Sequence, residues 1–157
     1  MKGWDYAVPG YYFVTVCTKD RFPWFGEIAD GKMIYTLAGK VVEQELENTV
    51  RIRKNVSIDT RIIVPDHVHV IIGETLVETP RRGVSTIRTW KSGTLGAIIN
   101  QFKSVCTKRI RKLGWVDFAW QARFYDHILR NENELENIRA YIAANQLIQI
   151  DDCHNVK

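Results

Sequence analysis

Apolar positions along the chain repeat with the two-residue period of strands in some segments and with the period of helices in others. Residues 11–18 (YYFVTVCT) are β-branched and aromatic and predict a first strand. Residues 57–64 and 67–72 predict two further strands, separated by a turn or kink at Pro65-Asp66. A fourth strand with irregular ends is expected within residues 118–129. Together these segments predict a sheet.

Three other segments have apolar residues at helical spacing. Residues 37–50 carry an apolar stripe opposite a row of glutamates, and residues 95–113 carry a longer stripe. The last helix should begin at Asn131 as its N-cap, with Glu134 three residues later, and should run to about Asn145.

The remaining segments are rich in glycine, proline or polar residues. Residues 19–31 are expected to form a loop, followed by a short strand at 32–35, and residues 81–96 a flexible connection. The order strand, helix, two strands, helix, strand, helix predicts an α+β sandwich, with helices packed on a largely antiparallel sheet. We expect one domain that spans residues 1–157.

Composition agrees with one compact domain. The apolar fraction of 45% in 157 residues is sufficient for a core. The formal charge of +4 arises from 22 Lys and Arg against 18 Asp and Glu, and it favours a polyanionic partner. Three widely spaced cysteines argue against a disulfide framework. No signal peptide and no apolar run of ~20 residues are visible, so we expect a cytoplasmic protein.

Residues 65–72 (PDHVHVII) contain the pattern that is most informative about chemistry. Because side chains alternate along a strand, His67 and His69 should point to one face and Val68 and Val70 to the other. Two imidazoles one strand repeat apart can bind the same metal ion. Two polar residues on a partly exposed strand face would produce the same pattern. The pair nevertheless holds two of only four histidines, which favours a metal site.

The last helix offers a nucleophile. Tyr141 and Asn145 are four residues apart and share a helix face, displaced from the core residues Leu135 and Ile142. A helical tyrosine is usually a core aromatic, but beside a metal-bound phosphate its phenolate can attack phosphorus. Asn145 could supply an amide oxygen as a third ligand. Imidazole and oxygen ligands together favour Mg²⁺ or Mn²⁺.

A basic segment from Arg81 to Lys112 has nine Lys or Arg and no Asp or Glu in 32 residues. An exposed basic helix face is often only a solvated surface, but the absence of carboxylates favours a track for a phosphate backbone. Aromatic residues that could stack on unpaired bases, or belong to the core, are Trp90, Trp115, Trp120 and Phe124. The basic residues expected to line the track are Arg81, Arg82, Arg88, Lys91, Lys103, Lys108, Arg111 and Lys112.

With these three features in this order, the chain resembles the HUH single-tyrosine transposases, especially the REP-associated tyrosine transposases. The resemblance covers nearly all of the chain. It implies an α+β fold with a ferredoxin-like or RRM-like antiparallel sheet and helices packed on it. The matching segments are 11–20 (YYFVTVCTKD), 65–72, 96–112 (GAIINQFKSVCTKRIRK), 120–135 (WQARFYDHILRNENEL) and 138–145 (IRAYIAAN).

The resemblance also implies roles for individual residues. His67 and His69 would bind the divalent metal, with Asn145 as a further ligand, and Tyr141 would attack single-stranded or hairpin DNA. The reaction would leave a 5′-phosphotyrosine link and a free 3′-hydroxyl that can later rejoin strands, which makes the protein an endonuclease and strand transferase. Tyr125 is an alternative nucleophile. Tyr141 is preferred because the family's tyrosine lies on the final helix, four residues before an amide side chain.

Other functions remain open at this point. A catalytically inactive nucleic-acid-binding module of the same fold would need the basic segment but neither the metal nor the Tyr141 hydroxyl. An unrelated metallohydrolase is disfavoured, because 157 residues are too few for a (β/α)₈ barrel and Ile71 stands where an HxHxH run would need a third histidine. No membrane partner is expected, and a homodimer is left open.

Overall fold

The computed structural model describes residues 10–74, 78–81, 84–87 and 94–145. Four strands form one antiparallel sheet in the order β4-β5-β1-β8. They are β1 (Tyr11–Cys17), β4 (Val56–Val64), β5 (His67–Glu74) and β8 (Tyr125–Leu129). Three α-helices pack on it: α1 (Leu37–Ile52), α2 (Thr94–Lys112) and α3 (Glu132–Asn145). Smaller elements are η1 (Lys19–Arg21) and the hairpins β2 (Gly26–Ala29) with β3 (Lys32–Tyr35) and β6 (Glu78–Arg81) with β7 (Val84–Ile87).

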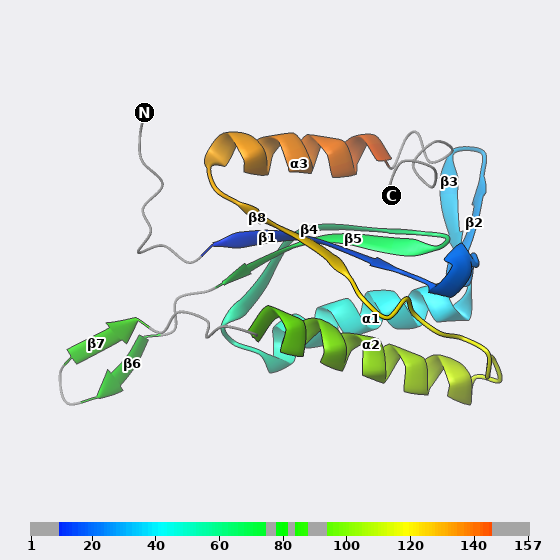
Figure 1. Cartoon of the computed structure of the whole chain (residues 1–157), viewed down its shortest axis with the longest axis horizontal. Coiled ribbons are helices and arrows are strands. Elements are labelled where there is room, and N and C mark those ends of the chain that lie inside the picture. Colours follow the sequence, from blue (N-terminus) through cyan, green and yellow to red (C-terminus); the bar gives the residue numbers. More distant parts are fainter. Residues whose placement is uncertain (1–9, 75–77, 82–83, 88–93, 146–157) are drawn as a thin grey trace.

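The chain order confirms the predicted fold. The sheet strands and the first two helices follow one another as β1-α1-β4-β5-α2-β8. Combined with the sheet order, this is the split β-α-β arrangement of ferredoxin-like folds. Helices α1 and α2 cover one face of the sheet, and α3 lies on the other (Figure 1). The predicted α+β class is therefore confirmed, with the sheet between two helical layers.

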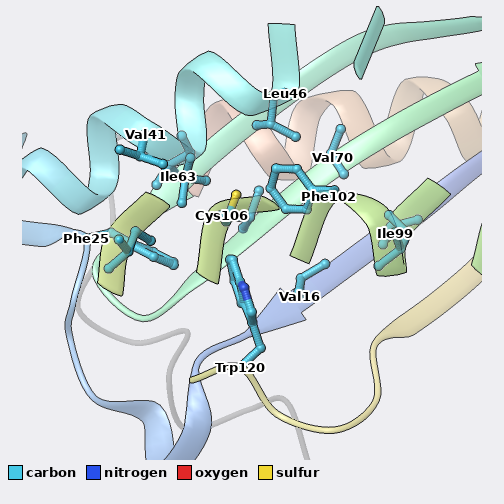
Figure 2. Close-up of a cluster of buried hydrophobic side chains, with 14 of the residues drawn as sticks. Val16, Phe25, Val41, Leu46, Ile63, Val70, Ile99, Phe102, Cys106 and Trp120 are labelled. Carbon is cyan, nitrogen blue, oxygen red and sulfur yellow. The ribbon is translucent and has the colours of Figure 1, made fainter. Parts of the chain in front are cut away.

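Both faces of β5 are buried, because helices cover the sheet on each side. Val68, Val70 and Ile72 point into the larger core beneath α1 and α2, part of which is shown in Figure 2. Ile71 belongs to the smaller core beneath α3. Since side chains alternate along the strand, His67 and His69 share the α3 face with Ile71.

Helices α1 and α3 begin where the sequence predicts, and each start has a side chain that caps it. The Thr36 hydroxyl accepts a hydrogen bond from the Gly39 N–H at the start of α1. At α3 the Asn131 side chain accepts from the Glu134 N–H at 2.9 Å, as an N-cap should. The Glu134 carboxylate accepts from the Arg130 N–H at 2.7 Å, one residue before the donor of a standard capping box.

Three segments differ from the sequence prediction. The loop expected at residues 19–31 contains strand β2, whose hairpin turns at Asp30 and Gly31, both with positive φ. An Asp-Gly pair favours this kind of turn, so a sequence signal was present. The connection expected at 81–96 includes β7. The strand expected within 118–129 begins only at Tyr125, preceded by a single bridge between Trp120 and Thr18.

No helix within the described part of the chain is both long and apolar enough to cross a membrane.

Candidate functional site

The two histidines of β5 lie buried beneath α3. Their side chains are only 2% (His67) and 1% (His69) exposed. The strand face that carries them is therefore buried beneath α3 and is not partly exposed. The register of β1 and β5 places Thr15 opposite His69 and Cys17 opposite His67. Neighbouring strands thus supply the surroundings of both rings.

Each histidine ring is held through its Nδ1 atom. The Nδ1 of His67 lies 2.7 Å from Oδ1 of Asp66, and the Nδ1 of His69 lies 2.8 Å from the Thr15 hydroxyl oxygen. Because a carboxylate only accepts, His67 Nδ1 carries a proton and donates it to Asp66. Both Nε2 atoms point at each other and are 3.1 Å apart. At this distance, either one Nε2 donates a hydrogen bond to the other or both ligate one cation.

The electrostatic environment keeps His69 neutral. Burial, followed by the charges of His67 and Arg21, lowers the pKa of His69 to about 3, although Asp66 opposes this shift. A neutral imidazole retains the lone pair that metal ligation requires. Burial also raises the pKa of the Cys17 thiol, so this neighbour is not a ready thiolate ligand.

The donor set fits a divalent cation with additional oxygen ligands. If two nitrogen ligands each lie about 2.1 Å from one ion and their bonds to the ion form a right angle, the two nitrogens are about 3.0 Å apart. This distance is close to the observed Nε2 separation. Within the described residues, no group of three or more His, Cys, Asp or Glu side chains could hold a metal ion. Within the described residues, the side chain that could add an oxygen ligand is the Asn145 amide, and water or a bound phosphate can supply others.

Helix α3 brings the predicted tyrosine to the histidines. The ring centroid of Tyr141 lies 5.7 Å from that of His69 and 6.3 Å from that of Phe13. Tyr141 is 36% exposed, so its ring lies at the edge of the buried site. One helical turn later, Asn145 is buried, and its Nδ2 atom has no hydrogen-bond partner among the described residues. Since amide oxygen and nitrogen are easily interchanged, this group suits a ligand role.

The alternative tyrosine is farther from the histidines. Tyr125 lies on the edge strand β8, opposite Thr15, which in turn is opposite His69. It therefore shares the sheet face of His69 but is two strand spacings away, roughly 10 Å. Its side chain is 56% exposed. The geometry favours Tyr141.

Sequence reasoning did not identify three residues that surround the pair: Thr15, Asp66 and Arg21. The Arg21 guanidinium lies 3.9 Å from the Asp66 carboxylate. Asp20 and Arg21 both have positive φ, which is unfavourable for residues other than glycine. Asp66 could have been suspected from its place before His67, whereas Thr15 and Arg21 approach only through the fold.

Comparison with known proteins gives both a relative and a fold. No family model matches the chain. A Haemophilus influenzae protein (strain Rd), itself described as uncharacterized, is 31% identical over 159 residues, which cover 97% of this chain and 88% of that protein. The chain belongs to the same family as that protein.

Two solved structures are similar in fold. One is a REP-associated tyrosine transposase bound to a REP hairpin, with a TM-score of 0.51 and 21% identity over 88% of this chain and 67% of the other. The second is a candidate transposase from Deinococcus radiodurans R1, with a TM-score of 0.54 and 15% identity over 92% and 96%. The chain has the fold of the HUH tyrosine transposases.

In this transposase fold, only part of the predicted basic track can be located. Lys108, Arg111 and Lys112 are exposed at the carboxyl end of α2. Lys103 is half-buried, its Nζ donates to the Gln121 carbonyl at 2.6 Å, and burial lowers its pKa. It therefore serves a structural contact. Arg81 ends β6, but its side chain lies outside the description, as do residues Arg82, Arg88 and Lys91.

The aromatic residues near the track divide between core and surface. Trp120 is buried, and its indole N–H donates to the Lys103 carbonyl at 3.2 Å. Trp115 and Phe124 are half-buried against the same core. Trp90 lies outside the described residues. Trp120 is thus excluded from base stacking by its burial.

Proposed function

We propose that the protein is a metal-dependent endonuclease and strand transferase that acts on single-stranded DNA, with Tyr141 as its nucleophile. The observation that carries this proposal is the convergence of two buried imidazole Nε2 atoms, 3.1 Å apart, beside a tyrosine ring 5.7 Å from His69. Two histidines that served only the packing of the core would not require a partly exposed tyrosine ring beside them.

The residues that would hold the metal are His67 and His69 through Nε2, with Asn145 through its amide oxygen. Bound there, the ion would supply Lewis-acid polarisation of the scissile phosphate. Asp66 and Thr15 fix the ring orientation and the tautomer from the far side, as outer partners of metal-binding histidines commonly do.

Tyr141 would attack phosphorus through its Oη. A new Oη–P bond forms on the 5′ side, and the bond from phosphorus to the 3′ oxygen breaks. The phenol loses its proton, and the departing 3′ oxygen gains one and becomes a hydroxyl. In the reverse direction the same hydroxyl attacks the phosphotyrosine, which rejoins strands without an external energy source.

The proposed substrate follows from fold and charge. The REP-associated transposase of similar fold is bound to a DNA hairpin, and this chain carries exposed cations at the end of α2. We propose that Lys108, Arg111 and Lys112 contact phosphates of single-stranded or hairpin DNA. An inactive module of the same fold would bind such DNA but would not cut it.

The test uses a labelled hairpin DNA with single-stranded flanks, incubated with protein and Mg²⁺ or Mn²⁺ and resolved on a denaturing gel. We expect metal-dependent cleavage by the wild type and none by His67→Ala or His69→Ala. His127→Ala is the matched control, because His127 is an exposed histidine on the same sheet. Thermal unfolding checks that the variants fold. Cleavage by the double variant, or by wild type in excess chelator, would contradict the metal role.

A further inference from the structure

A row of aromatic rings leads from the core to the surface. Phe118 is fully buried, and its ring meets that of Trp24 edge-on, with centroids 5.8 Å apart. Trp24 also contacts Trp115 at 6.3 Å and Phe22 at 4.6 Å. We call Phe22, Trp24 and Trp115 the aromatic ladder. Phe22 is its outermost ring and is 55% exposed, so the ladder ends in an aromatic surface open to a ligand.

The backbone around the ladder is held in place before any ligand binds. Pro23 follows Phe22, which is extended at φ −67 and ψ 132. The Trp24 N–H donates to the Phe22 carbonyl at 2.9 Å across this proline. Gly114, with φ +109, ends α2 and returns the chain to Trp115. Because the backbone that carries Phe22 is already fixed, little backbone freedom is lost when a ligand binds to its ring.

One buried residue, Thr18, links the backbone of Phe22 to the backbone of Asp66 through hydrogen bonds. Its N–H donates to the Asp66 carbonyl at 2.9 Å. Its hydroxyl oxygen lies 2.8 Å from the Phe22 carbonyl and 3.0 Å from the Asp66 carbonyl. Asp66 directly precedes His67 and holds its ring. The backbone at Phe22 is therefore anchored to the residue that precedes and orients His67.

Cations predominate over carboxylates around the ladder. The Arg111 Nε donates to the Phe118 carbonyl at 3.1 Å, which places the basic end of α2 beside the ladder, and the exposed acidic neighbours are Asp20 and Asp117. Aromatic faces for bases and cations for phosphates are the combination that binds single strands. A second copy would bring the same excess of positive charge to this face, which disfavours self-association here. The exposed cations are Lys19, Arg111 and Lys112, while Arg21 is paired with the buried Asp66.

We infer that the loop after β1 binds single-stranded DNA, with the Phe22 ring stacked on an unpaired base. This inference rests on the proposed function for its DNA substrate, while base stacking itself can be measured without cleavage.

The experiment measures fluorescence anisotropy of a labelled single strand of about 16 nucleotides, in chelator so that no cleavage occurs. Phe22→Ala should weaken binding by about 5- to 160-fold, the effect of losing one stacked base. Phe22→Tyr keeps the ring and should retain wild-type affinity. Ile52→Ala, which shortens an apolar side chain on α1 that is also more than half exposed, should bind like wild type.

An abasic scan locates the contacted base. Single abasic sites are placed along the hairpin's single-stranded flank, and binding is measured for wild type and Phe22→Ala. One abasic position should weaken wild type and leave the variant unaffected, because the stacking partner is already missing. Equal affinities of wild type and Phe22→Ala, or identical abasic profiles, would overturn the inference. It would also be overturned if Phe22→Ala reduced self-association of the protein and left DNA binding unchanged.

The two proposals fail in different ways. DNA binding that depends on Phe22, in a protein that never cuts DNA, would reject the nuclease and retain the stacking site. Cleavage by a protein whose DNA binding does not depend on Phe22 would retain the nuclease and reject the stacking site.

Discussion

At the scale of single residues, the site depends on groups that do not themselves face a substrate. Asp66 and Thr15 each engage one Nδ1 and so turn both Nε2 atoms toward the same point. Outer partners of this kind typically contribute 10–100-fold to metal affinity or activity, a range taken as an order of magnitude. The preorganisation of the histidine pair is therefore a property that a substitution outside the pair can remove.

Thr15→Val tests this preorganisation with little change in side-chain shape. The variant lacks the oxygen that fixes His69, so metal affinity should fall by about 10-fold or more while the fold is retained. Isothermal titration with Mn²⁺ measures the affinity, and circular dichroism checks the fold. Ser57→Ala is a control that removes a hydroxyl from β4, where it contacts only a backbone carbonyl in the described residues. Unchanged Mn²⁺ affinity in Thr15→Val would show that the Thr15 hydroxyl does not orient His69.

At the scale of elements, helix α3 must be held in register with the sheet if Tyr141 is to meet His69. Arg139, two residues before Tyr141, donates through Nε and Nη2 to both carboxylate oxygens of Asp59. Asp59 is the extra residue of a bulge in β4, between Ile58 and Thr60. The Asp59 carboxylate at the bulge thus forms a bidentate ion pair with Arg139, which holds the middle of α3 against the edge strand β4.

Arg139→Gln should therefore affect catalysis more than stability. A partly exposed ion pair contributes up to about 1 kcal/mol, whereas a small displacement of the nucleophile can cost about 10- to 100-fold in rate. We expect single-turnover adduct formation to slow by this factor with little change in DNA affinity. Glu136→Gln is the matched control, since Glu136 also contacts Arg139 but lies on α3 itself. Equal adduct rates in Arg139→Gln and wild type would contradict the positioning role.

Neutralising exposed lysines at the carboxyl end of α2 tests whether this end contacts DNA phosphates. Lys108→Gln with Lys112→Gln removes two exposed cations and leaves Arg111, which bonds the Phe118 carbonyl. For single strands the slope of log affinity against log salt should fall by about 0.7 for each lost contact. Arg51→Gln with Lys54→Gln removes equal charge at and just after the carboxyl end of α1, and the carboxyl ends of α1 and α2 lie at opposite ends of the helical layer (Figure 1). If both pairs change the slope equally, the effect is net charge rather than a track.

At the scale of the whole molecule, local patterns in the sequence predicted more than long-range placements. The alternation of β5 placed His67 and His69 on one face, and the spacing of α3 placed Tyr141 with Asn145, because both relations are fixed by local geometry. Burial of the pair beneath α3 and the partnership with Thr15 depend on tertiary packing and strand register, which a local pattern does not encode. Lys103 looked equivalent to Lys112 in sequence, but the phase of α2 turns it toward Gln121.

The proposed mechanism requires that Tyr141 becomes covalently joined to DNA. Tyr141→Phe removes only the hydroxyl from a partly exposed ring, so the packing of α3 should survive. We expect this variant to bind metal and DNA like wild type and to form adduct at least about 10³-fold more slowly. Tyr125→Phe is the matched control and should remain active.

The most direct measurement is peptide mapping of the trapped protein–DNA adduct by mass spectrometry after proteolysis and nuclease treatment. The structure predicts a 5′-nucleotide on the peptide that contains Tyr141. A nucleotide on the peptide that contains Tyr125 would contradict the choice of nucleophile, and cleaved DNA without any protein-linked nucleotide would contradict the tyrosine mechanism as a whole.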